Sequence, residues 1–349
     1  MKVLKIIGKI LGILAALAVV CCIVILIIFR NEVLTIASIE KIDDYPIYTM
    51  DYKGTYWFEE FMETNGMVSH RDFSAFFMNK VTRGLVENDG KITPRKTAMC
   101  TCFVCRNENG DIIYGRNLEQ GGYCPPVVVS THAGKYDTIG TAFLVDSNEE
   151  MPELKRKINM LTEPYFTADG MNETGVAISL LSVPYSILPD NGDVPLLSAD
   201  QVCRLVLDQA GSVDEAVELF SKFNLDASPL EQLSACHFLI ADRSGKMVVV
   251  ELHNGKTSVV LPIHDNYMTV TNFYLNDEIS SGIGQARYKY IEKALEEKQG
   301  VLSEEEALEL LASVKDPHIH AEWTSVYNLT TGDMYIMPKS QLDRVHRIR

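Results

Sequence analysis

An uncharged stretch of 20 residues, Ile10 to Phe29, lies near the start of the chain. At about 1.5 Å per residue, a helix of this length crosses the roughly 30 Å hydrocarbon core of a membrane. A cleaved signal peptide usually has a shorter apolar region, about 7–15 residues, and ends at a small-x-small site, which residues 25–30 do not offer. The stretch therefore predicts an uncleaved transmembrane anchor and separates the first thirty residues from any soluble domain.

The charges around this stretch predict its orientation. Lys2, Lys5 and Lys9 precede it, and acidic residues follow it within the next fifteen positions. Lysine-rich flanks stay preferentially on the cytoplasmic side of a membrane. We therefore expect a single-pass protein of the cell membrane, held through residues 10–29, with its large domain on the extracellular side.

The rest of the chain reads as an acidic globular body. After residue 30 about 320 residues remain, enough for one large domain with an accessory segment. The net charge of −15 argues against nucleic acid as a partner. A nucleic-acid binder needs a basic surface that releases phosphate counterions.

Residues 31–99 combine an extended stretch with a helical region. Ser38 to Tyr52 looks extended, whereas Tyr56 to Leu85 shows helical periodicity with aromatic residues on one face. Gly66 and residues 69–72 divide this region into two helices. Two short amphipathic helices cannot form a core alone, so we expect them to pack on the domain that follows.

A β-hairpin follows this segment and carries the first chemical signal. Cys100 begins one expected strand and Arg116 ends the next, with a turn at residues 107–111 between them. A guanidinium beside a thiol favours the thiolate, which is the form that attacks carbonyl carbon. The pair predicts a cysteine nucleophile.

Other interpretations of the cysteines stay open. Cys100, Cys102 and Cys105 could hold a metal or exchange disulfides, but Cys105 should point to the opposite face of the strand from the other two. All three could instead be packing residues, or Cys100 could pair with a histidine. Cys203 and Cys236 read as small buried hydrophobic residues.

The hairpin also carries a recurring residue pattern. A cysteine followed by threonine, then sixteen residues after the cysteine the arginine of Gly-Arg-Asn, and an acid three positions later, resembles the choloylglycine hydrolase family. This family contains bile-salt hydrolases, penicillin V acylases and acid-ceramidase-like amidases. The matching positions are Cys100, Thr101, Gly115, Arg116, Asn117 and Glu119. Glu119 stands where the family usually has aspartate.

Later stretches resemble the same family in the same order. Residues 169–184 and 241–251 look like its next two hairpins. Asn272 matches the oxyanion-binding asparagine, and Arg287 matches a second catalytic arginine at the start of a helix. Ser182 falls in the expected substrate site where bile-salt hydrolases have asparagine, which argues against bile salts in particular.

The resemblance implies an α+β fold, the four-layer αββα sandwich of N-terminal nucleophile (Ntn) hydrolases. The expected domains are a membrane tip and anchor at 1–30, a helical pro-segment at 31–99 and a catalytic domain at 100–349. Further turns at Gly245 and Gly332, with helices near residues 198–223, 287–298 and 303–313, agree with such a layered fold.

The resemblance also implies a mechanism. Self-cleavage between Met99 and Cys100 would free the α-amine of the cysteine to act as base, and the two pieces would stay associated. Arg116 would favour the thiolate, Asn272 would bind the oxyanion and Arg287 would add positive charge. Glu119 would anchor the α-ammonium of the cysteine, and neither a cofactor nor a metal is expected.

The expected activity is hydrolysis of a linear amide C–N bond in a small-molecule N-acyl compound. Two alternatives remain, namely an acyltransferase that uses the same thioester and a catalytically idle, membrane-anchored binding domain. The expected partners are the amide substrate, the membrane and, in a homo-oligomer, further copies of the chain.

Overall fold

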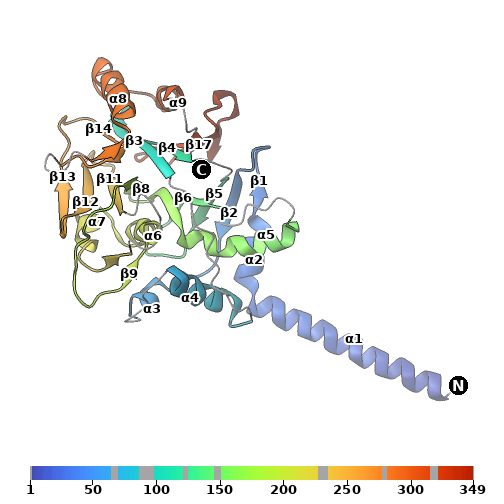
Figure 1. The fold of residues 1–349 in the computed structure, drawn as a ribbon. Helices are drawn as coiled ribbons and strands as arrows, with labels where there is room; N and C mark the ends of the chain where they lie inside the picture. The colour runs from blue at the N-terminus through green and yellow to red at the C-terminus, as the bar shows by residue number, and fades with distance from the viewer. Residues whose placement is uncertain are drawn as a thin grey trace.

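The computed structural model describes residues 2–63, 70–85, 98–120, 125–144, 151–226, 235–276, 281–314 and 321–348. Figure 1 shows a body of sheets and helices from which one long helix, α1 (Lys2–Ile28), projects. The body mixes helices and sheets, as the predicted α+β class requires.

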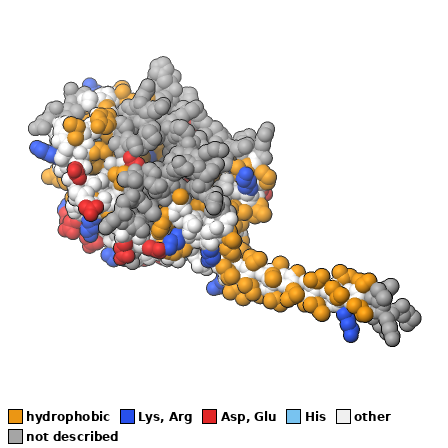
Figure 2. All heavy atoms as spheres, turned by 60° about the horizontal axis from the view of Figure 1, so that its bottom comes forward, with side chains coloured by type: hydrophobic (Ala, Val, Ile, Leu, Met, Phe, Trp, Pro, Cys, Tyr) orange, Lys and Arg blue, Asp and Glu red, His pale blue; other side chains and the backbone are white. Residues whose placement is uncertain are grey.

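Helix α1 is apolar over nearly its whole length. Its segment Ile6–Ile28 has 23 residues, and no part of its apolar window is buried in the body. At about 1.5 Å per residue it is about 34 Å long, enough to cross a membrane. Figure 2 shows hydrophobic side chains covering the visible face of the projecting helix. Its length and composition fit a membrane anchor and also a signal sequence.

Nine strands of the described chain form the larger sheet, in the order β1-β2-β5-β6-β7-β8-β11-β12-β13. Neighbouring strands are antiparallel except β2 and β5, which are parallel. The bounds are β1 (Glu40–Lys41), β2 (Tyr48–Tyr52), β5 (Pro126–Thr131), β6 (Thr138–Phe143), β7 (Thr167–Asn172), β8 (Ala177–Val183), β11 (Ala235–Ala241), β12 (Met247–His253) and β13 (Lys256–Val260).

Six strands form the second sheet, in the antiparallel order β14-β3-β4-β17-β18-β19. Two short pairs, β9 with β10 and β15 with β16, complete the strands of the described residues. The bounds are β3 (Ala98–Arg106), β4 (Ile112–Gln120), β9 (Leu196–Leu197), β10 (Asn224–Leu225), β14 (Met268–Val270), β15 (Asn272–Phe273), β16 (Gly282–Ile283), β17 (Ala321–Asn328), β18 (Met334–Pro338) and β19 (His346–Ile348).

The two large sheets share an apolar core. Cys102 and Tyr114 enter it from the six-stranded sheet, and Leu181 and Leu239 enter it from the nine-stranded sheet. Successive side chains of a strand point to opposite faces, so each sheet also presents an apolar outer face that must be covered.

Helices cover these outer faces. On the nine-stranded sheet, Val206 of α6 (Ala199–Gln209) belongs to one core with Phe238, and α7 (Val213–Leu219) adds to the same core. On the six-stranded sheet, Ile291 of α8 (Gln285–Glu297) and Leu308 of α9 (Glu304–Ser313) pack with Phe103. The smaller helices are α5 (Glu153–Asn159), η1 (Met160–Tyr165) and η2 (Leu342–Arg344).

The segment before Cys100 is built into the nine-stranded sheet. After α2 (Arg30–Ser38), the stretch expected to be extended contains β1 and β2. The expected helical region contains α3 (Phe58–Glu63) and α4 (His70–Thr82), while Gly66 lies outside the described residues. Phe77 of α4 stacks on Tyr165, with 3.9 Å between ring centroids.

The hairpins predicted around residues 107–111, 172, 245 and 332 are confirmed as β3/β4, β7/β8, β11/β12 and β17/β18. Gly245 has a φ of 87°, a left-handed conformation that costs glycine little. The predicted helices correspond to α6, α7, α8 and α9, and Ser303 with Glu306 forms a capping box on α9.

Candidate active site

Cys100 and Arg116 meet across the β3/β4 hairpin, as their spacing predicts. Arg116 is the partner of Cys102 in the strand register, which makes it a diagonal neighbour of Cys100. Its Nη2 lies 3.4 Å from the Cys100 Sγ and 3.3 Å from the carbonyl oxygen of Leu180. Both side chains are fully buried between the sheets.

Asp169 on β7 holds Arg116 from the other side. Its carboxylate forms an ion pair with Arg116 Nη1 and accepts hydrogen bonds from the hydroxyls of Thr141, Ser325 and Tyr327. A buried guanidinium requires such a partner, because an unpaired charge in a protein interior is expensive. Asp169 was not among the predicted site residues, and no local pattern of charge or spacing connects it with Arg116.

Asn272 binds the backbone of Cys100. Its Oδ1 accepts a hydrogen bond from the Cys100 N–H at 2.8 Å, and its Nδ2 donates to the carbonyl of Ser182, also at 2.8 Å. The Cys100 Sγ itself lies 3.7 Å from the carbonyl of Leu180. Asn272 thus links the first residue of the expected catalytic chain to strand β8 of the opposite sheet.

Arg287 approaches Cys100 from helix α8. Its Nη1 lies 2.8 Å from the Cys100 carbonyl oxygen, 2.8 Å from Thr101 Oγ1 and 2.7 Å from Glu119 Oε2. Its Nη2 lies 2.8 Å from Asn272 Oδ1. One guanidinium therefore contacts three of the other predicted site residues.

Glu119 joins this network through Thr101 and Arg287. Its Oε1 accepts the Thr101 hydroxyl proton at 2.8 Å, and its Oε2 pairs with Arg287. The hydrogen-bond acceptor for the Cys100 N–H is Asn272. The anchoring of a Cys100 ammonium by Glu119 therefore stays a prediction.

The start of α8 explains how an arginine on a helix becomes buried. Gly284 caps the helix with a left-handed φ of 95°, and Arg287 follows in the first turn with 4% of its surface exposed. A Cβ on Gly284 would lie 2.8 Å from the Arg287 Nη2 and 2.9 Å from Thr271 Oγ1. Glycine is needed here both for the backbone conformation and for the space that the guanidinium occupies.

The protonation state of Cys100 differs from the expectation. Burial raises the pKa of the Cys100 thiol above its ordinary value, and the nearby Arg116 offsets only part of that effect. Arg116 does favour the thiolate, but desolvation outweighs it in this uncut chain. The thiol is therefore protonated at neutral pH.

The metal and histidine alternatives gain no support from the geometry. Cys100 and Cys102 face the core between the sheets, whereas Cys105 packs toward α8 and α9. Within the described residues no three metal-binding side chains gather at one point. The hydrogen-bond partners of the Cys100 Sγ there are Arg116 and Leu180, and His318 and His320 lie outside this part of the chain.

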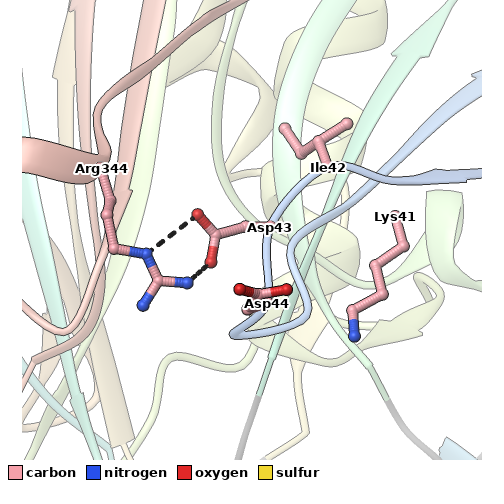
Figure 3. Close-up of a pocket in the computed structure, with 5 residues that line it drawn as sticks. All are labelled: Lys41, Ile42, Asp43, Asp44 and Arg344. Atoms are coloured by element: carbon pink, nitrogen blue, oxygen red, sulfur yellow. Dashed lines mark hydrogen bonds and ion pairs between the residues drawn. The ribbon is translucent and has the colours of Figure 1, made fainter.

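A pocket of about 370 Å³ lies away from these residues. It is lined by Lys41, Ile42, Asp43, Asp44 and Arg344. Figure 3 shows the Arg344 guanidinium directed at the Asp43 carboxylate, which also contacts His346 Nε2 at 2.7 Å. The pocket contains none of the predicted site residues, and its charges join the β1–β2 loop to the C-terminal end of the chain.

Comparisons with known proteins agree with this arrangement of sheets. Two structures of variants of the conjugated bile acid hydrolase from Clostridium perfringens match with TM-scores of 0.51 and 0.50, each at 16% identity. They cover 72% and 71% of this chain and 92% of their own. Penicillin V acylase from Agrobacterium tumefaciens matches at 20% identity and a TM-score of 0.48, over 68% of this chain and 83% of its own. No curated protein sequence matches the chain.

Residues 100–275, just over half of the chain, match a sequence model described as linear amide C–N hydrolases, choloylglycine hydrolase family. The matched region begins at Cys100 and includes Arg116, Glu119, Ser182 and Asn272. The chain therefore belongs to the choloylglycine hydrolase family of linear amide C–N hydrolases.

Proposed function

We propose that this protein is a cysteine Ntn amidohydrolase that cleaves the linear amide bond of a small-molecule N-acyl compound. The contacts around Cys100 are the observation that carries the proposal. Its thiol lies beside Arg116, its N–H is bound by Asn272 and its carbonyl is bound by Arg287. These groups surround both the nucleophile and the nitrogen that would become its base.

The first step would be self-cleavage between Met99 and Cys100. The Sγ attacks the Met99 carbonyl carbon, the C–N bond breaks, and the nitrogen takes up the thiol proton as it becomes an amine. Water then hydrolyses the thioester and leaves a Met99 carboxylate. Met99 lies within β3 directly before Cys100, and Arg287 Nη2 lies 3.7 Å from the Met99 Sδ. Both observations support this position for the cut.

Cleavage would give Cys100 the base that the uncut chain lacks. An α-amine has an ordinary pKa of about 7.7–8.0, so a neutral fraction exists at neutral pH. This amine takes the thiol proton as Sγ attacks the substrate carbonyl, and then delivers it to the leaving nitrogen. Water hydrolyses the acyl-thioester, which releases the acid and restores the thiol.

Asn272 is suited to bind the oxyanion of the tetrahedral intermediate. An amide nitrogen carries two protons, and the Ser182 carbonyl accepts one of them. The second is available to a substrate oxygen, with Arg287 adding positive charge nearby. Loss of one such donor costs about 10²–10³-fold in turnover in other hydrolases.

We further propose that the packed sheets and helices are the four-layer αββα fold of this enzyme class, with residues 31–99 as its pro-segment. Residues 10–29 would anchor the protein in the cell membrane with the catalytic domain outside the cytoplasm. Three lysines before the span support this orientation. The 99-residue piece would remain bound, because its strand β2 pairs with β5.

The test compares the wild-type protein with Cys100→Ala and Cys203→Ala. We expect N-terminal sequencing and intact mass to show wild type as pieces of 99 and 349 − 99 = 250 residues, the second beginning at Cys100. Wild type should hydrolyse at least one amide from a panel of conjugated bile acids, penicillin-type side-chain amides and lipid amides. Cys100→Ala should remain uncut and inactive, whereas Cys203→Ala, a buried cysteine on α6, should be cut and active.

An uncut chain that turns over amides would contradict the Ntn mechanism. A correctly cut chain that is inactive on every class of amide would contradict the hydrolase assignment and favour a binding role. Addition of a primary amine to the assay separates hydrolysis from acyl transfer, because transfer forms a new amide in place of the free acid.

A further inference from the structure

The backbone that carries Asn272 receives little support from the large sheets. The chain pairs with β3 only as far as Val270, and Asn272 then belongs to β15, a strand of two residues. The position of Asn272 relative to Cys100 therefore depends on side chains that form hydrogen bonds with the backbone nearby. His237 on β11 and Glu251 on β12 provide these contacts.

His237 and Glu251 bind the backbone on both sides of Asn272. His237 Nε2 lies 2.8 Å from the carbonyl oxygen of Thr271, directly before Asn272. Glu251 accepts hydrogen bonds from the N–H of Leu275 at 2.7 Å and of Asn276 at 3.3 Å, three and four positions after it.

The two side chains also contact each other. They are directly opposite in the β11/β12 register, and His237 Nδ1 lies 3.4 Å from Glu251 Oε1. Both are fully buried. They stand on the nine-stranded sheet, whereas the chain reaches Asn272 from the six-stranded sheet, so the pair joins the two sheets at the candidate active site.

The hydrogen-bond geometry assigns the donors and acceptors around this pair. A carbonyl can only accept, so His237 Nε2 must carry a proton. Burial opposes the charge of Glu251, but the contacts with His237 and the two N–H groups outweigh it and lower the pKa of Glu251. Glu251 is therefore an ionised acceptor for the two backbone N–H groups, and His237 Nδ1 faces it at 3.4 Å.

We propose that His237 and Glu251 are positioning residues that hold Asn272 in register with Cys100. Neither side chain contacts the Cys100 Sγ or the Asn272 amide in the described residues, so they act through the backbone at positions 271, 275 and 276. The proposal rests on the proposed oxyanion role of Asn272. Displacing a catalytic group by about 1 Å can cost about 10²-fold in rate, so small movements of this segment matter.

The chain contains a matched control pair. His264 and Glu292 also form a histidine–carboxylate contact, with 3.8 Å between Nε2 and Oε2, but both side chains are partly exposed. Their substitution removes the same chemical groups without touching positions 271–276.

The first experiment needs no enzyme activity. Hydrogen–deuterium exchange is measured on the full chain carrying Cys100→Ala, so that every sample is one uncut polypeptide. Adding Glu251→Leu should speed exchange of the amides of Leu275 and Asn276, because they lose their acceptors. Adding Glu292→Leu should leave these amides unchanged. Equal protection with and without Glu251 would overturn the proposal.

The second experiment measures turnover of the processed enzyme at a temperature where every variant is folded. His237→Leu removes the donor to Thr271, and kcat should fall about 10- to 100-fold with little change in KM. His237→Gln keeps a donor N–H at that position and should recover part of the loss. His264→Leu and His264→Gln should match wild type.

The outcomes separate this proposal from the proposed function. If Asn272→Ala keeps full turnover, the oxyanion role fails. The exchange experiment still tests whether Glu251 holds the backbone at positions 275 and 276. If Asn272→Ala is impaired but His237→Leu has wild-type kcat, the positioning role is wrong. If His237→Leu and His237→Gln lose kcat equally, the hydrogen bond to Thr271 does not carry the effect and the proposal also fails.

Discussion

At the scale of single residues, the site consists of charged side chains buried between the two sheets. Burial opposes the charge of Arg116, but Asp169 and the neighbouring thiols outweigh it and raise the pKa of Arg116 above its ordinary value. The guanidinium is therefore a permanent cation beside Cys100. Its orientation depends on Asp169, whose two oxygens are oriented by the hydroxyls of Thr141, Ser325 and Tyr327.

Asp169→Asn should therefore destabilise the protein. The change leaves Arg116 without a counter-charge, and breaking a buried pair in this way costs about 3–5 kcal/mol. The measurement is equilibrium urea unfolding in the Cys100→Ala background, which keeps all samples as one chain. Asp214→Asn is the control, because Asp214 pairs with Lys246 at the surface and should change stability by about 1 kcal/mol or less. Equal losses in the two variants would contradict the structural role of Asp169.

Buried thiols predict a loss of stability at alkaline pH. Burial raises the pKa of the Cys203 thiol well above its ordinary value. Below a pH of about 8.5 both folded and unfolded chains keep this proton, so it does not affect the pH dependence. Above that pH the unfolded chain loses the proton and the folded chain keeps it, so the free energy of unfolding falls as pH rises.

Cys203→Ala should make this alkaline fall shallower, by up to about 1.4 kcal/mol per pH unit. Urea unfolding between pH 8 and about pH 10 measures the slope. Val206→Ala, also buried on α6, should lower stability at every pH but keep the wild-type slope. A Cys203→Ala slope as steep as wild type would mean that this thiol ionises in the folded chain.

At the scale of elements, two long paired strands position the nucleophile and Arg116, whereas a two-residue strand and the start of a helix position Asn272 and Arg287. Cys100 and Arg116 lie on two paired nine-residue strands, β3 and β4. Asn272 lies on a two-residue strand, and Arg287 lies in the first turn of a helix capped by a left-handed glycine. The second group needs side-chain contacts to hold its place, which explains the network of Glu119, Arg287 and Asn272.

Helix α4 offers a test of how the N-terminal segment attaches. Phe77 is 1% exposed and stacks on Tyr165, whose hydroxyl bonds to that of Tyr52 on β2. Phe77→Ala should cost about 3–5 kcal/mol in urea unfolding of the Cys100→Ala chain, because it removes a buried aromatic ring. Leu85→Ala should change stability by less than about 0.5 kcal/mol, since Leu85 is 75% exposed. Similar values for the two would show that α4 does not pack firmly on the body.

At the scale of the whole molecule, the segment before Cys100 is joined to the body at several distant points. Strand β2 extends the nine-stranded sheet through β5. The Asp43 carboxylate contacts Arg344 near the C-terminus (Figure 3). It also contacts His346, and the Tyr45 hydroxyl donates to Glu322 on β17. The body thus includes strands and ion pairs from both sides of the expected cut.

These contacts predict that the N-terminal piece would stay bound after the proposed cleavage. After cleavage, residues 1–99 should co-elute with the 250-residue piece in native detergent buffer and separate only in denaturant. Asp43→Asn should lower the urea concentration that releases the anchor piece, because Arg344 loses a buried ion-pair partner. Asp51→Asn, which alters a half-exposed pair with Lys53, should not. Spontaneous loss of the piece in native buffer would contradict this arrangement.

The sequence alone was sufficient wherever a feature depends on neighbours along the chain. Alternating strands, turn residues and the sixteen-residue spacing are sufficient to predict that Cys100 lies beside Arg116. The apolar run at residues 10–29 likewise predicted a helix there, although α1 begins earlier, at Lys2, and ends at Ile28. Strand geometry predicted that Cys105 would face away from Cys100. These features follow from the helical and strand periods, which are local properties of a polypeptide.

Tertiary structure decided the contacts that cross between sheets and the energies that depend on burial. Family resemblance marked Asn272 and Arg287, but only the fold shows that both reach the backbone of Cys100. The ion pair of Asp169 with Arg116 depends on the packing of β7 against β4 across the two sheets. Burial raises the pKa of the Cys100 thiol because desolvation exceeds the attraction of Arg116. Such contacts join residues far apart in sequence, and desolvation depends on everything that surrounds a group, so neither can be read from local pattern.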